Sequence, residues 1–451
     1  MKIGKRLLAV ILVLTMVITM MPIVAFADEV EKPEAEIYAD ILNALGLFKG
    51  TMEGYELERI PTRVEASVML VRLLGKEAAA LNSTDQHPFT DTPEWADGYI
   101  SYMYAQGLTK GVSEFSFEPN SNCDGKMFVT FALRALGFDD SKGDFEYDQA
   151  LNFGRMQQLL TGDDVLRYAE SGFKRGDMVI IANNALAVEL NGSDKMLIEK
   201  LYEEGAVDMQ SAKKIIDIIE ANDLVEMASY NTYSFSWAES ASEQKINISV
   251  SGYPTRTTTI NSIMKGADLN TNPKISYEYT YSFPDGSTAT AERYIVDGYD
   301  YLKDAVGNLT KEKYDMESEI ESYEMENPLE KYQKITIDKK QDGSAKITIT
   351  FSTTANDAVN LADMLAEVWL ASPDLKESQY MVSCTKYEKT YTINEAGQLT
   401  AVEEDLDLTY MEDGDANTYK VNVTMKINYK NIGKTVTVDI PSNLNQYKEV
   451  K

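Results

Sequence analysis

The chain has 451 residues, a length typical of two or three domains of about 150 residues each. It contains 43 basic and 72 acidic residues, which give a formal net charge of −29 at pH 7. A surface of this sign repels nucleic acid, anionic lipid and the anionic polymers of a cell wall. Binding to any of them therefore requires a local basic site.

Residues for catalysis and metal binding are scarce. His87 is the only histidine, which excludes Ser-His-Asp and Cys-His catalysis at any other position and excludes multi-histidine metal sites. It stands in the loop-like stretch DQHPF, where we expect a solvated side chain. Cys123 and Cys384 are too few for a disulfide framework and form either one bridge or two inert thiols. No nucleophile elbow, phosphate loop or H-E-x-x-H motif is present, and the acidic residues select no catalytic pair.

The N-terminus has the features of a secretory signal peptide over residues 1–27. Lys2, Lys5 and Arg6 precede an apolar run that ends at the A-x-A sequence 25–27. Removal of this segment takes away three basic residues and no acidic ones, so the mature chain is more acidic. A retained membrane anchor is the alternative, because the run is nearly long enough to cross a bilayer.

The stretch IPTRVE, 60–65, predicts the start of a short helix. Thr62 and Glu65 have the S/T-x-x-E spacing in which each side chain caps a backbone N–H of the other residue. An apolar helical face follows, and Gly75 stands where a helix commonly ends. Thr62 is then the N-cap and Arg63 the first helical residue, at a position that favours an anion and disfavours a cation. Arg63 either pairs with Glu65 or solvent, or it serves in binding.

The same pattern recurs along the chain. The copies are PTRVEASVMLVRLLG (61–75), CDGKMFVTFALRALG (123–137) and the weaker FKRGDMVIIANNALA (173–187). A further helical pattern precedes each copy, and such short helices must pack on one another to bury their apolar faces. We therefore expect an all-α domain over 28–228, made of closing helices and three repeats. The expected repeats span about 36–80, 89–140 and 144–205.

These units resemble the S-layer homology (SLH) domains of bacterial surface proteins. The likeness rests on PTRVE with LVRLLG in the first unit, on FTDTPEWADGYI and GLTKGVSEFSFEPN in the second, and on FKRGDM in the third. It covers about residues 36–205. The resemblance implies a pseudo-threefold helical bundle that anchors the protein noncovalently to a secondary cell-wall polysaccharide, often one bearing pyruvate ketals. It also implies that the motif arginine contacts the acidic sugar.

The resemblance assigns polysaccharide binding to particular residues. Arg63 would combine a fixed cation with free N–H donors of the helix start, and Glu65 would hold this arginine. The third unit keeps Arg175 and Asp177 but has Lys174 in place of the capping threonine. We therefore expect a well-formed groove around Arg63 and a weaker one around Arg175.

The second unit departs most from the pattern. Asp124 can still cap its helix, but Gly125 replaces the arginine and Met127 replaces the acid. Lys126 is at best a partial substitute, so we expect this unit to be mainly structural. Trp95 follows a helix-start signal and either packs between repeats, which we favour, or stacks on a sugar ring.

Beyond about residue 228 the hydrophobic period changes from 3.6 to 2. The segment TYKVNVTMKINY, 418–429, predicts a strand with one buried face. Similar strands, separated by turn signals, are predicted at 245–251, 274–283, 345–351, 405–411 and 434–440. Residues 356–370 have a strong helical pattern. We therefore expect an α+β domain over 229–451, with a large curved antiparallel sheet and a helix packed on its apolar face.

This half is weakly similar to bacterial lipid-carrier-like half-barrel lipoproteins, in which a bent sheet wraps a helix or an apolar ligand. The resemblance implies that the face with Tyr419, Val423, Met425 and Ile427 lines either a cavity or a filled core, and we favour the core. The acidic segments 403–408 and 412–417 lack the spaced ligands of a calcium loop.

These patterns together predict a secreted, multidomain protein of the cell wall or cell surface of a Gram-positive-type bacterium. Its predicted partner is secondary cell-wall polysaccharide, and no nucleic acid, cofactor, metal or enzymatic activity is predicted. The first alternative is an extracellular carrier or binding protein for an apolar or peptide ligand in the C-terminal half. The second is a cell-wall glycosidase that uses carboxylates alone, because 72 acidic residues permit one.

Overall fold

The computed structural model describes residues 33–170, 172–233, 237–250, 255–267, 274–314, 328–353, 380–412, 418–434 and 436–449. The chain divides into two compact units, a helical unit over Glu31–Ile219 and a sheet unit that contains Glu220–Lys451. The predicted signal peptide (1–27) and the predicted helix at 356–370 lie outside the described residues. Among the described residues, no helix combines the length and the apolar character that a bilayer crossing needs.

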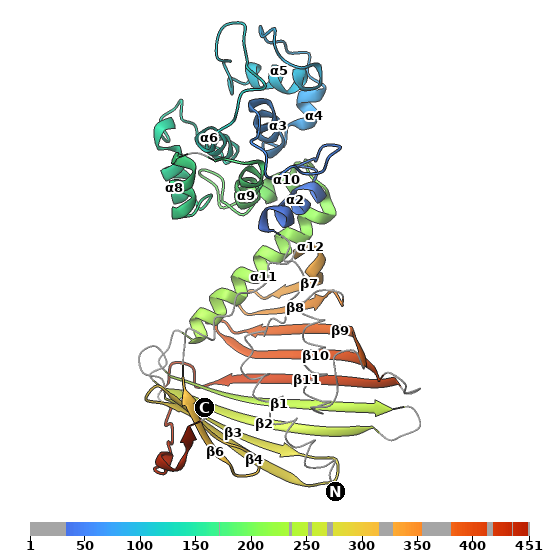
Figure 1. The fold of residues 1–451 in the computed structure, drawn as a ribbon, viewed down its shortest axis with the longest axis vertical. Coiled ribbons are helices and arrows are strands. Elements are labelled where there is room, and N and C mark those ends of the chain that lie inside the picture. The colour runs from blue at the N-terminus through green and yellow to red at the C-terminus, as the bar shows by residue number, and fades with distance from the viewer. Residues whose placement is uncertain are drawn as a thin grey trace. The chain divides into compact units, whose positions relative to one another are not determined.

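Short helices and long loops make up the helical unit (Figure 1). The helices are α2 (Glu34–Ala44), α3 (Arg63–Leu73), α4 (Glu77–Leu81), α5 (Asp97–Ala105), α6 (Gly125–Ala135), α7 (Ala150–Met156), α8 (Gly162–Glu170), α9 (Arg175–Leu186) and α10 (Leu197–Glu203), with the 3-10 helices η1 (Glu94–Ala96) and η2 (Tyr147–Gln149). Helix α11 (Met209–Tyr233) begins in this unit and ends in the sheet unit.

Helix α3 shows how the sequence ends such a helix. Its apolar side chains, including Val64, Leu70 and Leu73, are buried. Gly75 follows with φ +74°, and its N–H donates to the Arg72 carbonyl oxygen. A Cβ atom at Gly75 would lie 2.9 Å from Leu201 Cδ2, so both the backbone conformation and the close neighbour require glycine here.

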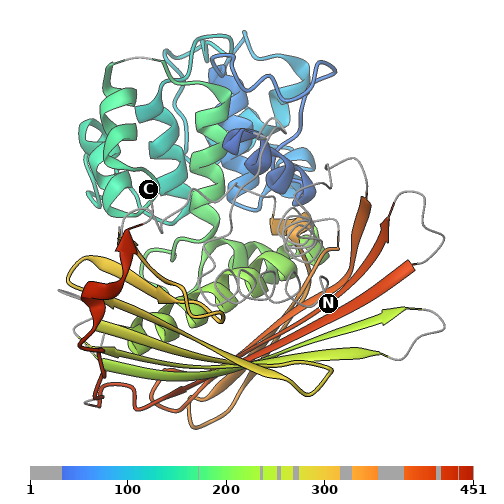
Figure 2. The same cartoon turned by 60° about the horizontal axis from the view of Figure 1, so that its bottom comes forward.

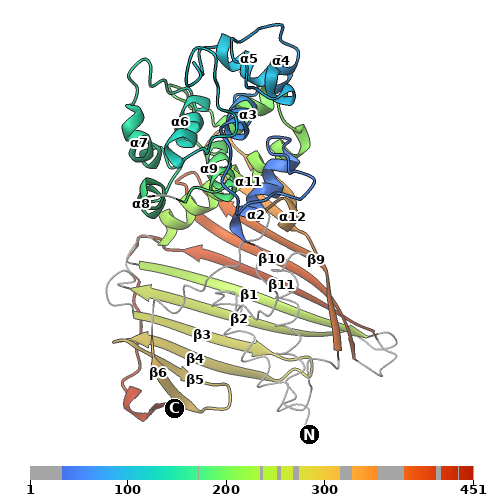
Figure 3. The same cartoon turned by 45° about the horizontal axis from the view of Figure 1, so that its top comes forward.

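A 12-stranded sheet organises the sheet unit, and its curvature and twist are visible in Figures 2 and 3. The spatial order is β12-β6-β5-β4-β3-β2-β1-β11-β10-β9-β8-β7. The strands are β1 (Trp237–Val250), β2 (Arg256–Ala267), β3 (Lys274–Ser282), β4 (Thr288–Val296), β5 (Tyr299–Lys303), β6 (Leu309–Lys313), β7 (Tyr332–Lys339), β8 (Ala345–Phe351), β9 (Tyr380–Ile393), β10 (Leu399–Glu412), β11 (Thr418–Lys430) and β12 (Lys448–Glu449). Neighbouring strands are antiparallel except β12, which is parallel to β6.

One face of the sheet carries the main core of this unit. Val421, Val423 and Met425 of β11 are buried in that core, as are side chains of β1, β2, β3, β8, β9 and β10. Leu224 and Val225 of α11 pack against the same cluster. The alternation of buried and exposed residues along β8 follows from the period of two, which turns successive side chains to opposite faces.

Aspartate–glycine turns close two of the hairpins. Gly286 has φ +80° and Gly343 has φ +87°, a conformation that glycine adopts without steric cost. The preceding residues, Asp285 and Asp342, each accept a backbone N–H and a hydroxyl hydrogen bond from the serine two positions later. These turns therefore set the register of the strands on either side.

The predicted fold class was wrong. The structure has a 12-stranded, mostly antiparallel sheet in its C-terminal half. The N-terminal half also contains isolated β-bridges at Thr51–Gly54, Thr62–Asn122 and Glu189–Met196. Self-similar amphipathic patterns identify short helices, but they do not report the long loops whose backbones pair with one another.

The predicted strands were only partly correct. Segments 245–251, 274–283, 345–351, 405–411 and 418–429 coincide with parts of β1, β3, β8, β10 and β11. In contrast, residues 436–440 form no strand, although Val436 is buried. An alternating pattern thus indicates one buried face, whereas a strand also needs a neighbour for its backbone.

A buried ion pair lies on β4 and β5. The side chains of Arg293 and Asp300 are 5% and 10% exposed, and Arg293 Nε lies 2.9 and 2.8 Å from the two carboxylate oxygens of Asp300. The guanidinium also lies 5.6 Å from the centre of the Tyr277 ring. Two charges withdrawn from water in this way depend on each other.

We predict that Asp300→Ala lowers the free energy of unfolding of the sheet unit by about 3–5 kcal/mol, because it leaves the Arg293 charge buried without its carboxylate. Urea denaturation of the full chain, followed by the β-sheet circular dichroism signal, measures this change. The control is Glu243→Gln, which removes an exposed pair with Lys245 and should cost less than about 1 kcal/mol. Equal effects of the two substitutions would contradict the prediction.

Candidate functional site

The start of helix α3 is closed by a reciprocal cap. Thr62 is the N-cap, and its hydroxyl accepts a hydrogen bond from the Glu65 N–H, with 3.4 Å between oxygen and nitrogen. In return, the Thr62 N–H donates to Glu65 Oε2 at 2.8 Å. The carboxylate of Glu65 is thereby fixed beside the first turn of the helix.

The first-turn backbone donors are occupied, so the expectation of free N–H groups at this helix start was wrong. The Arg63 N–H donates to the Ser121 carbonyl oxygen at 2.8 Å, and the Val64 N–H donates to the Pro119 carbonyl oxygen at 3.1 Å. The Cys123 N–H donates back to Pro61 at 2.8 Å. The segment before α6 therefore takes the place that a ligand anion would need.

Glu65 binds two arginines, and neither of them is Arg63. Its carboxylate accepts from Arg59 Nη2 at 2.7 Å and from Arg175 Nη1 at 2.8 Å. The expectation that Glu65 holds Arg63 was therefore wrong. Burial alone would raise the pKa of Glu65, but the hydrogen bonds from Arg59 and the Thr62 N–H, together with the charge of Arg175, lower it below 4.5.

Arg175, at the start of α9, is a buried structural residue. Its side chain is 4% exposed, its Nε donates to the Tyr55 carbonyl oxygen at 3.0 Å, and its guanidinium lies 5.1 Å from the centre of the Phe48 ring. Burial lowers the pKa of Arg175, and the charge of Glu65 opposes this shift. A ligand could reach Arg175 only after these contacts open.

Asp177 is also committed to the protein. Its carboxylate accepts from the Lys174 N–H at 2.7 Å and from Arg167 Nη1 at 2.6 Å, and the side chain is 5% exposed. It thus caps α9 in the way that Glu65 caps α3, although Lys174 has no hydroxyl with which to complete the cap.

Arg63 differs from these arginines in having no acidic partner among the described residues. Its guanidinium lies 4.9 Å from the centre of the Phe117 ring, and its buried Nε has no hydrogen-bond partner in the described part of the chain. Burial lowers the pKa of Arg63, and the nearby Cys123 and Glu118 oppose that effect. The side chain keeps partial contact with solvent.

The start of α6 cannot hold an arginine at the matching position. Asp124 caps this helix by accepting from the Met127 N–H at 2.8 Å. A Cβ atom at Gly125 would lie 2.7 Å from Tyr168 Cβ, which explains the glycine. Lys126 pairs with Asp148 at 3.0 Å and lies 5.4 Å from the centre of the Tyr147 ring.

The side chains of Trp95 and His87 are not in the environments that we expected. Trp95 on η1 is 60% exposed, so the favoured packing between repeats is wrong. In the ranges the structure covers, no ring or cation contact joins Trp95 to Arg63. The His87 side chain is 4% exposed and stacks on Phe89 with 5.1 Å between ring centres, so the expected solvated histidine is also wrong.

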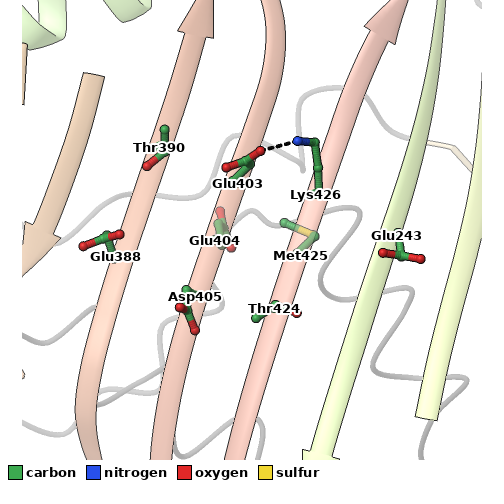
Figure 4. A pocket seen from close by; sticks show the side chains of 9 residues that line it. All are labelled: Glu243, Glu388, Thr390, Glu403, Glu404, Asp405, Thr424, Met425 and Lys426. Atoms are coloured by element: carbon green, nitrogen blue, oxygen red, sulfur yellow. Dashed lines mark hydrogen bonds and ion pairs between the residues drawn. The ribbon is translucent and has the colours of Figure 1, made fainter. Parts of the chain in front are cut away.

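A second candidate region is a shallow pocket of about 260 Å³ on the polar face of the sheet (Figure 4). Its lining residues are Glu243, Glu388, Thr390, Glu403, Glu404, Asp405, Thr424, Met425 and Lys426.

The described residues contain no group of three or more His, Cys, Asp or Glu side chains arranged to hold a metal ion. Segment 413–417, part of one acidic stretch considered for calcium, lies outside the described residues. Cys123 and Cys384 are both free and buried.

We did not predict from the sequence the contacts made by Arg59, Phe48 and Phe117. Phe48 and Phe117 each face an arginine at a helix start, at 5.1 and 4.9 Å. The sequence contains part of this information, because an aromatic residue stands in the loop before each of the helices α3, α6 and α9. The pairing itself joins residues far apart in the chain, and no local pattern reports it.

We predict that Glu65→Gln destabilises the helical unit by about 2–3 kcal/mol at pH 7, because Arg59 and Arg175 lose their shared carboxylate. The folded-state pKa of Glu65 is lowered, so its contribution is present above the ordinary value of 4.5 and is lost as the pH falls through the lowered value. The measurement is the difference in unfolding free energy between wild type and variant, from helical circular dichroism at several pH values. A difference that persists unchanged in acid would contradict the prediction.

Comparison with known proteins gives a family match within the helical unit. The S-layer homology domain model matches residues 88–125. A "Cell surface protein" of Thermoanaerobacter kivui is 33% identical over 162 residues, which are 35% of this chain and 20% of that protein. A "Surface layer protein" of Brevibacillus choshinensis is 25% identical over 229 residues, 47% of this chain and 20% of that protein. An "Endoglucanase" of Bacillus sp. (strain KSM-635) is 29% identical over 148 residues, 30% of this chain and 15% of that protein.

These matches correct one prediction and support others. The matched family region is single, so the expected all-α domain of three repeats in a pseudo-threefold bundle was wrong. The chain spans about a fifth or less of the length of these relatives. Through the matched region and these names, the chain is similar to cell-surface proteins that carry an S-layer homology domain.

Proposed function

We propose that this S-layer homology domain protein is held noncovalently on the cell wall by its helical unit, which binds an acidic secondary cell-wall polysaccharide. The ligand is inferred from the resemblance of PTRVE and its neighbouring segments to S-layer homology domains. The family match at 88–125 supports this inference. The sheet unit is then the part that the anchor displays outside the cell.

The observation that carries the proposal is the unpaired state of Arg63. The chain as a whole is strongly acidic, so its overall field repels a polyanion. Attraction must come from a local cation that no carboxylate of the protein neutralises. Arg59 and Arg175 share Glu65, whereas Arg63 has no ion-pair partner among the described residues and keeps partial contact with solvent.

The surroundings of Arg63 suit a carboxylate on a sugar. Its guanidinium is positioned over Phe117, which limits its rotamers before any ligand binds. A planar guanidinium can donate two parallel hydrogen bonds to a carboxylate such as a pyruvate ketal. Because the backbone donors of the α3 start are occupied, the side chain alone supplies the recognition.

The other candidate residues take supporting roles in this proposal. Glu65, Arg175 and Asp177 hold the helix starts in place, and Thr62 and Asp124 cap them. Lys126 is already paired with Asp148 and contributes less charge to a ligand. Trp95 is exposed and offers an apolar ring to a sugar face.

The alternatives gain less support. The pocket on the sheet is lined mainly by carboxylates, which does not favour an apolar ligand in the C-terminal half. The stretch shared with the endoglucanase covers 15% of that enzyme, and no acid pair of this chain is singled out for glycoside hydrolysis. We therefore include no enzymatic activity in the proposal.

We predict that Arg63→Ala raises the Kd for purified cell-wall sacculi about ten- to hundredfold, the range expected when one charge-assisted contact is lost. Arg63→Lys should recover only part of the affinity, because an ammonium lacks the paired donors. Co-sedimentation of the full chain with sacculi, before and after extraction of secondary polysaccharide, gives the measurement.

Two controls make this experiment selective. Arg155→Ala removes an exposed arginine of α7 and should leave binding unchanged. Arg175→Ala should first lower the stability of the helical unit, because the charge of Glu65 is left partly unbalanced. Binding that survives extraction of the polysaccharide, or that Arg63→Ala leaves intact, would refute the proposed anchor.

A further inference from the structure

Strand β7 forms one edge of the 12-stranded sheet (Figure 1). It pairs with β8 on one side, and no strand of the described residues pairs with it on the other. The central residues Lys334, Thr336 and Asp338 are exposed. An edge of this kind presents backbone N–H and C=O groups that can pair with a further strand.

The two faces of β7 differ in character. Ile335 and Ile337 lie opposite Ile349 and Ile347 of β8 and pack against the main core. Thr336 points to the opposite face of the strand. Lys334 and Asp338, two positions before and after Thr336, point to the same face as Thr336. Within the described part of the chain, neither Lys334 nor Asp338 has an ion-pair partner. Lys346 of β8 lies opposite Asp338 in the register but forms no ion pair with it. Among the described residues, the edge thus carries one cation and one anion outside any ion pair, placed symmetrically about Thr336.

We propose that β7 is a self-association surface and that its partner is β7 of a second copy of this chain, paired antiparallel about Thr336. In this register Lys334 of each copy lies directly opposite Asp338 of the other, and Thr336 lies opposite its own counterpart. Ile335 lies opposite Ile337 of the second copy on the apolar face. The two sheets then continue into each other with their apolar faces on the same side.

Charge favours this register over the others that keep the apolar faces together. A slide that centres the pairing on Ile335 places Lys334 opposite Thr336, and one that centres it on Ile337 places Asp338 opposite Thr336, so neither forms the Lys334–Asp338 pairs. A slide that centres the pairing on Lys334 places Lys334 opposite Lys334, and one that centres it on Asp338 places Asp338 opposite Asp338. Like charges directly opposite each other destabilise a strand pair, whereas unlike charges stabilise it. A slide by a single residue would turn the apolar face of one sheet to the polar face of the other.

The same residues explain why the edge need not pair with unrelated strands. A lysine in the middle of an edge strand opposes pairing with a strand that lacks a matching acid. Asp338 removes this obstacle only for a strand with the same sequence in the proposed register. The partner is therefore another copy of this chain, and the inference does not depend on the proposed binding of polysaccharide.

Charge reversal tests the proposal with the full chain. Sedimentation equilibrium between about 1 and 100 µM covers the range in which an interface with a micromolar Kd assembles. We expect the wild type to dimerise, and Lys334→Asp or Asp338→Lys alone to raise the dimer Kd at least about tenfold, because each change creates two like-charge pairs. The double variant Lys334→Asp/Asp338→Lys should restore dimerisation, since it exchanges the charges and keeps them complementary.

A cysteine substitution tests the register separately. Thr336→Cys should yield a disulfide-linked dimer on mild oxidation, because the two residues 336 lie opposite each other, while native Cys123 and Cys384 are buried. Lys346→Cys, exposed on the neighbouring strand β8, is the control and should not crosslink. A wild type that stays monomeric, single variants that dimerise like the wild type, or a double variant that stays monomeric would each overturn the proposal.

Discussion

The shared carboxylate of Glu65 is the interaction on which the helical unit depends. It caps α3 through Thr62 and forms ion pairs with both Arg59 and Arg175, which joins the first turn of α3 to the first turn of α9. Arg59 has a second carboxylate partner in Glu56, whereas the buried Arg175 depends on Glu65 for its ion pair. Among the described residues, the neighbouring Arg63 has no carboxylate partner.

This distribution of charge would allow an acidic protein to bind the acidic ligand that we propose. The net charge of −29 opposes binding to a polyanion at long range, and salt screens that repulsion beyond about 10 Å. In the proposed anchor, the guanidinium of Arg63, held on Phe117 and in no ion pair among the described residues, makes the contact with the ligand. In the sheet unit, charge would have a different use, because Lys334 and Asp338 would specify the register in which the edge strand pairs.

Local patterns in the sequence predicted local structure well, but they did not predict contacts between residues far apart in the chain. The spacing of Thr62 and Glu65 predicted the cap, and alternation predicted β11 and parts of four other strands. The partner of Glu65 was misjudged because Arg175 lies 110 positions away in the chain, whereas Arg63 lies two positions away. Likewise, 436–440 alternates like a strand but forms none, and repeated amphipathic patterns suggested three repeats where one family region is matched.

Recognition of the acidic substituent of a wall polysaccharide by the guanidinium of Arg63 can be measured with two polysaccharide preparations. The measurement is calorimetric titration of the full chain with purified polysaccharide, before and after mild acid hydrolysis of its ketal-linked pyruvate. We expect wild-type affinity to fall upon hydrolysis to the level of Arg63→Ala, and hydrolysis to change nothing further for Arg63→Ala. Equal affinity of the wild type for both preparations would contradict it.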